Sequence, residues 1–198
     1  MSILLSSVVC FAAGDGGAGP GAEDPFRDLP TYDVVTPEEI KRDFVRLEFL
    51  PLGQPDLAFY FLTPREWVSE PITLTPTHLK NDDKVPVPVA LARSPDKTAT
   101  IEVAFLRVPQ GTVLEDWARG YIQRNELQLL LFQTGKFTGR TVFDALVQAT
   151  GGYRVRLTFF LRGNRMFVMA GSAPTALYST YAKILAAATV SFSFAQPG

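Results

Sequence analysis

The sequence has little of the chemistry that most metal centres and many active sites require. It holds one cysteine, Cys10, and one histidine, His78. A lone cysteine excludes an internal disulfide and a thiolate cluster around zinc or iron–sulfur. A lone histidine removes most zinc and copper sites, and the Gly-x-Ser-x-Gly motif that exposes the nucleophile of many hydrolases is absent from the sequence. We therefore predict no catalytic residues, no metal, no cofactor and no enzymatic activity.

An excess of charge of one sign is also lacking. Nineteen Lys and Arg residues face twenty Asp and Glu residues, which leaves a net charge of −1. No overall field therefore draws the protein to nucleic acid or to an anionic membrane surface, and we predict no nucleic-acid partner. The hydrophobic share of 46% is typical of a folded protein. The length of 198 residues predicts one domain, over residues 31–198, behind a segment of residues 1–30.

The first thirty residues have the pattern of a leader followed by a linker. Ile3–Ala13 is an apolar run of eleven residues, too short to cross a bilayer as a helix but typical of the apolar region of a signal peptide, although no Lys or Arg precedes it. Residues 14–25 are rich in Gly, Pro and acids and predict a flexible linker. We expect an exported, periplasmic protein, with a cytoplasmic protein that retains its leader as the alternative. Membrane association is expected only through the leader or through a lipid on Cys10, for which an ordinary hydrophobic cysteine is the alternative.

The first half of the domain reads as one short helix followed by strands. Thr36-Pro37-Glu38-Glu39 predicts a helix start, because Thr caps and Pro suits the first helical position. Pro71 confines the third predicted strand to a sheet edge, and residues 76–86 predict an exposed loop. A turn is expected at Ser94–Lys97. The predicted strands are Leu47–Leu52, Leu57–Leu62, Val68–Thr75, Val87–Arg93 and Thr98–Val108.

The second half alternates helices with glycine-punctuated strands. Thr112 predicts a helix start, with Glu115 completing a capping box. Gly163-Asn164 predicts a two-residue hairpin turn, and Ser172-Ala173-Pro174 a last helix before a closing strand at Val190–Phe194. The predicted strands are Leu127–Phe132, Arg140–Ala149 and Tyr153–Arg162. The fold class expected is α+β, with a mostly antiparallel sheet.

Several stretches between residues 56 and 194 carry a family resemblance. They are Leu62-Thr63-Pro64-Arg65-Glu66-Trp67, Val108–Trp117, Tyr153–Phe167, Ala170–Pro174 and Ser191-Phe192-Ser193-Phe194. Together they resemble the PsbP-like superfamily, which includes the extrinsic photosystem subunit, the bacterial DcrB-type proteins and the Ran-binding relatives of eukaryotes. The resemblance implies a twisted antiparallel sheet with helices on both sides, an α/β/α sandwich. It also implies a protein that binds other proteins and has no catalytic residues.

Arginines and one tryptophan are the candidate binding residues. Strand alternation places Arg154 and Arg156 on one face, while Arg162 and Arg165 flank the hairpin turn and Arg140 lies on the preceding predicted strand. Such a group suits an anion or an acidic partner surface. The alternative is pairing of these arginines with acids such as Asp144 and Glu102, or a solvated face.

Aromatic residues give two further expectations. Trp117 belongs to a helical stripe with Leu114 and Tyr121 and is expected in the core. Trp67 follows Arg65 and Glu66 and is a candidate rim contact. The predicted protein-binding residues are therefore Trp67, Arg154, Arg156, Arg162 and Arg165.

The loop around His78 offers the only metal alternative. His78, Asp82 and Asp83 supply an imidazole and two carboxylates within six residues, but their spacing fixes no coordination geometry. We expect a solvated loop there, and a hydrolase or metal-dependent enzyme built on His78 is the least favoured interpretation. The leading hypothesis is a non-catalytic accessory protein, exported or envelope-associated, that binds other proteins within a larger assembly. Its main rival is a cytosolic secretion chaperone or adaptor, acting as a dimer, that shields an apolar client segment.

Overall fold

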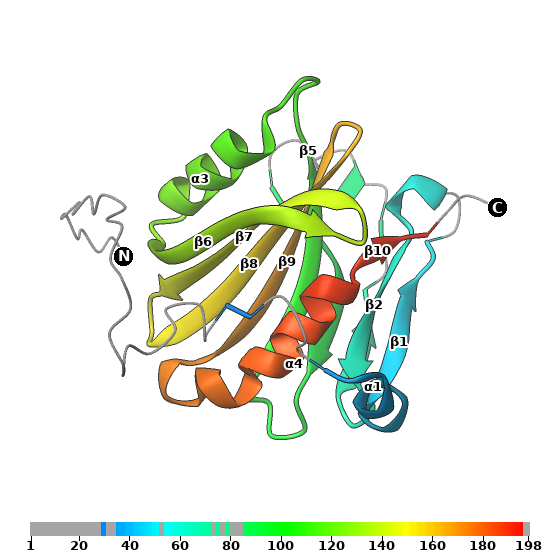
Figure 1. Ribbon diagram of the computed structural model, residues 1–198. Helices are drawn as coiled ribbons and strands as arrows, with labels where there is room; N and C mark the ends of the chain where they lie inside the picture. Colours follow the sequence, from blue (N-terminus) through cyan, green and yellow to red (C-terminus); the bar gives the residue numbers. More distant parts are fainter. Residues whose placement is uncertain are drawn as a thin grey trace.

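The computed structural model describes residues 29–30, 35–51, 54–72, 74–75, 78–79 and 85–195 (Figure 1). The predicted leader Ile3–Ala13, Cys10, the linker at 14–25, Asp82 and Asp83 lie outside these ranges. In the described part of the chain, no helix is long and apolar enough to cross a membrane.

Short helices and long strands make up the described chain. The α-helices are α1 (Pro37–Asp43), α3 (Leu114–Arg124) and α4 (Tyr178–Ser191), and the 3-10 turns are η1 (Pro55–Leu57) and η2 (Thr175–Leu177). The strands are β1 (Phe44–Phe49), β2 (Phe59–Pro64), β3 (Val68–Pro71), β4 (Val87–Arg93), β5 (Thr100–Arg107), β6 (Gln128–Phe137), β7 (Arg140–Ala149), β8 (Tyr153–Arg162), β9 (Arg165–Pro174) and β10 (Ser193–Phe194).

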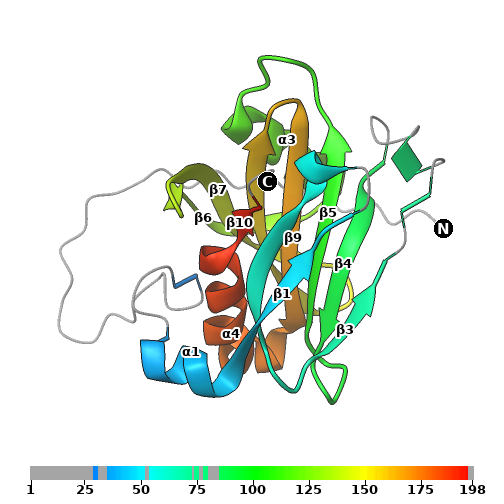
Figure 2. The same cartoon turned by 90° about the vertical axis from the view of Figure 1, so that its right-hand side faces the viewer.

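The strands form two antiparallel sheets. The larger has the order β3-β4-β5-β9-β8-β7-β6, and the smaller has the order β1-β2-β10. The mixed α+β class with antiparallel pairing is confirmed, and β3 is an edge strand as Pro71 predicted. The hairpin at Gly163-Asn164 is confirmed as well, because Arg162 pairs with Arg165 across it. Figures 1 and 2 show α4 lying alongside β2 of the smaller sheet.

Side chains of the larger sheet alternate between two hydrophobic clusters. The α3 cluster contains Phe159 of β8 and Val168 of β9, and the α4 cluster contains their chain neighbours Phe160 and Phe167. Helix α3 contributes Ala118 and Ile122 to the first cluster. Helix α4 contributes Ala182, Leu185 and Ala188 to the second. The period-2 alternation of a strand thus divides the apolar residues between the two helices.

Phe192 joins the two sheets. Its ring stacks on Phe160 of the larger sheet at 4.3 Å and on Phe59 of the smaller sheet at 5.2 Å between centroids. It also meets the edge of Phe194 at 5.2 Å. Offset stacks of this kind add to the free energy gained by burying the rings. The smaller sheet is therefore attached to the larger one through aromatic contacts.

The helix starts predicted at Thr36 and at Thr112 had opposite outcomes. The cap predicted at Thr36 is confirmed and belongs to a full capping box, because Thr36 Oγ1 accepts from the Glu39 amide at 3.2 Å and a Glu39 carboxylate oxygen accepts from the Thr36 amide at 2.7 Å. The capping box at Thr112 is wrong. Helix α3 begins at Leu114 after Val113, with no side-chain cap. The Thr112 hydroxyl instead donates to Pro109 O at 2.7 Å, so the preceding turn uses the group that would have capped the helix.

The predicted C-terminal elements begin and end in the wrong places. Ser172-Ala173-Pro174 finishes β9, and α4 starts only at Tyr178. Val190 and Ser191 lie in α4, so the closing strand is reduced to β10. Packing of α4 in the α4 cluster therefore outweighs the strand preference of this alternating segment. The side chain of Ser191 connects the end of α4 to β2, because its Oγ accepts a hydrogen bond from the Leu62 amide at 2.9 Å.

Candidate functional site

Arginines lie opposite one another across four adjacent strands at one end of the larger sheet. Arg107 of β5 pairs with Arg165 of β9, and Arg165 pairs with Arg162 of β8. In the β7–β8 register Val142 faces Phe160, so two residues further on Arg140 faces Arg162. We call these four residues, Arg107, Arg165, Arg162 and Arg140, the arginine row.

All four arginines belong to the face that carries the α4 cluster. Each lies two residues along its strand from a buried member of that cluster, and in a strand such residues share a face. Those members are Phe105, Phe167, Phe160 and Val142. Arg107 is exposed and the other three are half-buried. The row thus forms the rim of the α4 cluster where the cluster meets the short strand β10.

Arg140 and Arg162 lie on the neighbouring strands β7 and β8, and both contact the same aromatic ring. Each guanidinium carbon is 4.9 Å from the centroid of Phe194. Arg140 donates to Ser193 Oγ at 3.2 Å, and Arg162 donates to Ala58 O at 3.3 Å. Among the described residues these acceptors are neutral oxygens. In the described ranges no carboxylate pairs with either of these two charges.

Arg165 differs from Arg140 and Arg162 because a described acidic residue contacts it. It forms an ion pair with Asp56 of η1, and its guanidinium carbon lies 5.8 Å from the centroid of Phe105. The Nε of Arg165 is buried without a hydrogen-bond partner. Its side chain is 16% exposed, whereas that of Asp56 is 50% exposed. Asp56 therefore neutralises part of the row from its outer side.

Arg140, Arg162 and Arg165 carry more positive charge than the described residues around them compensate. Burial, and then the positive charge of Arg140, lower the pKa of Arg162. Burial lowers the pKa of Arg165. Both directions mean that the folded protein disfavours the charged form of these guanidinium groups. Like charges opposite each other on neighbouring strands also destabilise a sheet, so an anion bound at the row would relieve an existing cost.

The structure brings together two of the four arginines predicted from the sequence. Arg162 and Arg165 join Arg140 and Arg107 in the row. Arg107 was not among the predicted residues, because its strand neighbour β9 is distant in the sequence. The only local sign that Arg107 belongs to such a group was its position as the charged end of an apolar strand.

The other two predicted arginines lie further along β8. Arg154 and Arg156 share a face as predicted, but Arg156 is fully buried and forms a 2.7 Å ion pair with Asp144. Pairing with Asp144 was the alternative interpretation of these arginines, and it is confirmed for Arg156. Arg154 is half-buried.

Trp67 is buried, with 6% of its surface exposed. Its ring meets the edge of Tyr181 in α4 at 6.2 Å. The exposed residues at this corner are Arg65 and Glu66. The role of Trp67 in binding stays a prediction, and a partner at this corner would meet Arg65 and Glu66 before the indole.

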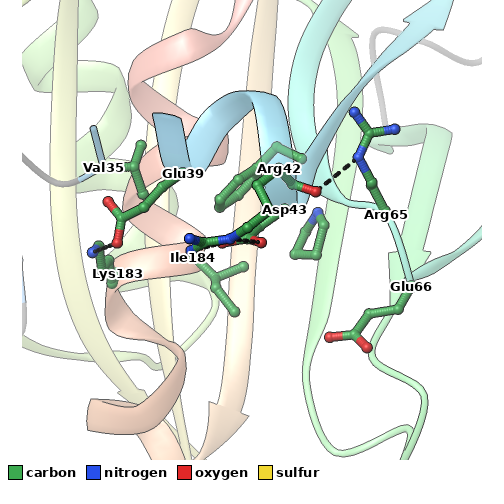
Figure 3. Close-up of a pocket in the computed structure, with 10 residues that line it drawn as sticks. Val35, Glu39, Arg42, Asp43, Arg65, Glu66, Lys183 and Ile184 are labelled. Carbon is green, nitrogen blue, oxygen red and sulfur yellow. Dashed lines mark hydrogen bonds and ion pairs between the residues drawn. The ribbon is translucent and has the colours of Figure 1, made fainter. Parts of the chain in front are cut away.

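A hollow of about 430 Å³ lies between α1, the end of β2 and α4 (Figure 3). Its lining residues are Val35, Glu39, Arg42, Asp43, Phe44, Pro64, Arg65, Glu66, Lys183 and Ile184. Three of them are basic and three acidic. Figure 3 shows two ion pairs among them, Glu39 with Lys183 and Arg42 with Asp43, each at 2.7 Å.

The charges in this hollow act on one another. The hydrogen bond from Lys183 lowers the pKa of Glu39, and the hydrogen bond from Arg42 lowers the pKa of Asp43. Arg65 Nε donates to the Arg42 carbonyl at 3.0 Å, near the end of α1. Among the described residues, the lining contains no histidine, cysteine, serine or threonine. The ion pair of Glu39 with Lys183 joins α1 to α4.

The predicted metal alternative gains no further ligand among the described residues. Within those ranges no group of three His, Cys, Asp or Glu side chains is placed to hold a metal ion. The His78 Nδ1 accepts from the Thr75 amide at 3.3 Å. The other two members of the candidate, Asp82 and Asp83, lie outside the described ranges.

The fold has a counterpart among solved structures. The solution structure of cyanobacterial PsbP (CyanoP) from Synechocystis sp. PCC 6803 matches with a TM-score of 0.54, over 77% of this chain and 93% of that chain. The fold is PsbP-like. At 12% identity the likeness concerns the fold alone. The PsbP-like resemblance is therefore confirmed for the fold. A crystal structure from Bacteroides thetaiotaomicron gives a TM-score of 0.41 at 14% identity, over 70% of this chain and 45% of that chain. No protein-family model matches the sequence, and no curated protein does.

Proposed function

We propose that this protein is a non-catalytic accessory protein, exported or envelope-associated, that binds an acidic surface of another protein within a larger assembly. The observation that carries the proposal is the arginine row, in which Arg140, Arg162 and Arg165 gather with Asp56 as their one acidic contact in the described ranges. Guanidinium groups bind carboxylates with two parallel hydrogen bonds. The partner chemistry that suits the row is therefore a surface rich in Asp and Glu.

The surroundings of the row favour a protein partner. Arg and aromatic residues are enriched in the cores of protein interfaces, and the row sits beside Phe194 and Phe105. Arg140 is held by Ser193 Oγ, Arg162 by the Ala58 carbonyl and Arg165 by Asp56, so little side-chain freedom is lost on binding. The lining of the α1–α4 hollow is mainly charged and does not favour the chaperone alternative, which needs an apolar groove.

The PsbP-like fold supports the same class of function, because the resemblance predicted an accessory role. The proposal includes the three-layer α/β/α arrangement, which the separate α3 and α4 clusters support. It also includes a leader over residues 1–30 and one domain over residues 31–198. Leu29 is 1% exposed and packs in the α4 cluster, so contacts with the sheet start two residues before that boundary.

Neutralising two arginines of the row tests the proposal. The row variant is Arg140→Gln with Arg162→Gln. The matched control is Arg46→Gln with Arg124→Gln, which removes the same charge from two arginines that also lie over rings, those of Tyr60 and Trp117. The probe is a poly-glutamate peptide, and binding is measured by isothermal titration at low and at physiological salt.

We expect the wild-type protein to bind the peptide with an affinity that falls as salt rises. The row variant should bind at least tenfold more weakly, while the control pair changes the affinity less than twofold. Equal losses in the two double variants would attribute binding to net charge and overturn the role of the row. Undiminished binding by the row variant would overturn it as well.

A further inference from the structure

The strand β6 forms a long open edge of the larger sheet. It stands last in the strand order, and in the described part of the chain it pairs with β7 alone. It is ten residues long, whereas β3 at the opposite edge has four residues and ends in Pro71. An edge strand presents a row of unpaired amide and carbonyl groups that can pair with another strand. Of the two edges, β6 is the one with length enough for such pairing.

The side chains of β6 do little to prevent such pairing. The strand contains no proline and no acidic residue, and Lys136 is its one charge. Leu130 and Phe132 are 37% and 41% exposed. Proteins usually protect an edge of this length with charges, a proline or a bulge. Two such features occur in β6: the charge of Lys136 and the register shift between Leu129 and Leu131, which leaves a regular stretch from Leu131 to Phe137.

Phe132 is held in position at this edge. Its ring stacks on Phe143 of β7 with centroids 5.5 Å apart and planes 12° apart. The guanidinium carbon of Arg119 from α3 lies 4.1 Å from its centroid. A half-exposed ring that is already ordered loses little conformational freedom when a partner covers it.

We propose that β6 of one copy pairs antiparallel with β6 of a second copy, centred on Thr134, and joins the two larger sheets into one. Thr134 is the midpoint of the regular stretch from Leu131 to Phe137. In this register Thr134 faces its own counterpart, and Phe132 faces Lys136 of the other copy. Residues opposite each other in an antiparallel pair share a face, and all three of these side chains are exposed.

The charges of β6 favour a second copy over a foreign strand. Because Lys136 faces Phe132, the two lysines do not face each other, and the cation that lies over this ring, Arg119, is already paired with Glu115 at 2.8 Å. The strand has no carboxylate with which to select a basic partner. The two-fold symmetry closes the assembly at two copies, as in most homo-oligomers. The inference depends on β6 and is independent of the arginine row.

The test uses the self-pairing of Thr134 in the full chain. In Thr134→Glu and in Thr134→Lys, like charges face each other at the centre of the interface. Mixing the two variants places Glu opposite Lys. The control is Ser69→Glu, which puts the same charge at an exposed position of the edge strand β3. Mass is measured by analytical ultracentrifugation, and far-UV circular dichroism checks that each variant folds.

We expect the wild type and Ser69→Glu to sediment at twice the chain mass of 21.8 kDa. Each Thr134 variant should dissociate at least tenfold more readily, and the equimolar mixture should return to the dimer. The row variant Arg140→Gln with Arg162→Gln should remain dimeric, so failure of the two proposals is distinguishable. A monomeric wild type, or dimers that persist in both Thr134 variants, would overturn the inference.

Discussion

Arg156 and Asp144 form a two-pronged ion pair that is shut off from solvent. Arg156 Nε donates to Asp144 Oδ1 at 3.1 Å and Nη2 donates to Oδ2 at 2.7 Å, with side-chain exposures of 1% and 0%. Thr158 Oγ1 and Gln133 Nε2 donate to the same carboxylate at 2.7 and 3.0 Å. Arg156 Nη1 donates to the Pro30 carbonyl at 2.8 Å. Both charges are therefore compensated, and one of the bonds fixes the segment Leu29–Pro30 to the sheet.

Removing one partner of this pair should destabilise the fold strongly. Asp144→Ala leaves the guanidinium buried without its counter-charge, and we expect the free energy of unfolding to fall by about 3–5 kcal/mol. Asp144→Leu combined with Arg156→Met replaces both charges by apolar groups and should recover most of that loss. Urea unfolding followed by circular dichroism measures both. A loss in Asp144→Ala below about 1 kcal/mol would contradict the buried pair.

Leu29 should contribute to stability like a core residue. Its side chain is 1% exposed in the α4 cluster, so Leu29→Ala removes buried methyl groups and should cost about 2–4 kcal/mol. Leu50 is 61% exposed, and Leu50→Ala should change the free energy of unfolding by less than about 0.5 kcal/mol. Equal effects of the two substitutions in thermal unfolding would show that residue 29 is not anchored.

Gly171 lets α4 approach β9. A Cβ atom at Gly171 would lie 2.9 Å from Leu185 Cδ2 and 3.2 Å from Leu185 Cβ. Gly171→Ala should therefore lower the free energy of unfolding by about 1–3 kcal/mol. Gly135 in β6 has open space around it, so Gly135→Ala is the matched control and should be close to neutral. Adding Leu185→Ala to Gly171→Ala should cost less than the sum of the two single effects, since the neighbours share one space.

Asp96 should make stability depend on pH in the acid range. Hydrogen bonds from Ser94 and from the amide and hydroxyl of Thr98, together with Tyr181, lower the pKa of Asp96. A carboxylate whose folded pKa lies below its unfolded value stabilises the fold above the unfolded pKa, and the contribution is lost as pH falls through the folded pKa.

The variant Asp96→Asn isolates this contribution. The wild type should exceed the variant in unfolding free energy by a constant amount near neutral pH, and the gap should narrow below about pH 4, the ordinary range of an aspartate. Urea unfolding at a series of pH values measures the gap. A gap that is the same at pH 7 and at pH 2 would contradict the role of the charged carboxylate.

Features set by neighbouring residues were predictable. The helix start at Thr36 and the Gly163-Asn164 hairpin each depend on a few adjacent side chains and on backbone preferences, and both were confirmed. Thr112 shows the limit of local prediction. Its hydroxyl could cap the following helix or bond within the preceding turn, and it donates to Pro109 O in the turn. The helical state of Val190 and Ser191 depends on the packing of the whole of α4, which no local pattern contains.

The sequence by itself determined which reactive and charged side chains are present: one histidine, one cysteine, balanced charge, and arginines grouped near one hairpin. It also determined that Arg156 and Arg162 share a face of β8, because side chains alternate along a strand. Only the tertiary structure decided that Arg156 is buried against Asp144 while Arg162 stands at the rim beside Arg140. The reason is physical: burial and cross-strand neighbours depend on which distant segments cover a strand and in what order the strands pair.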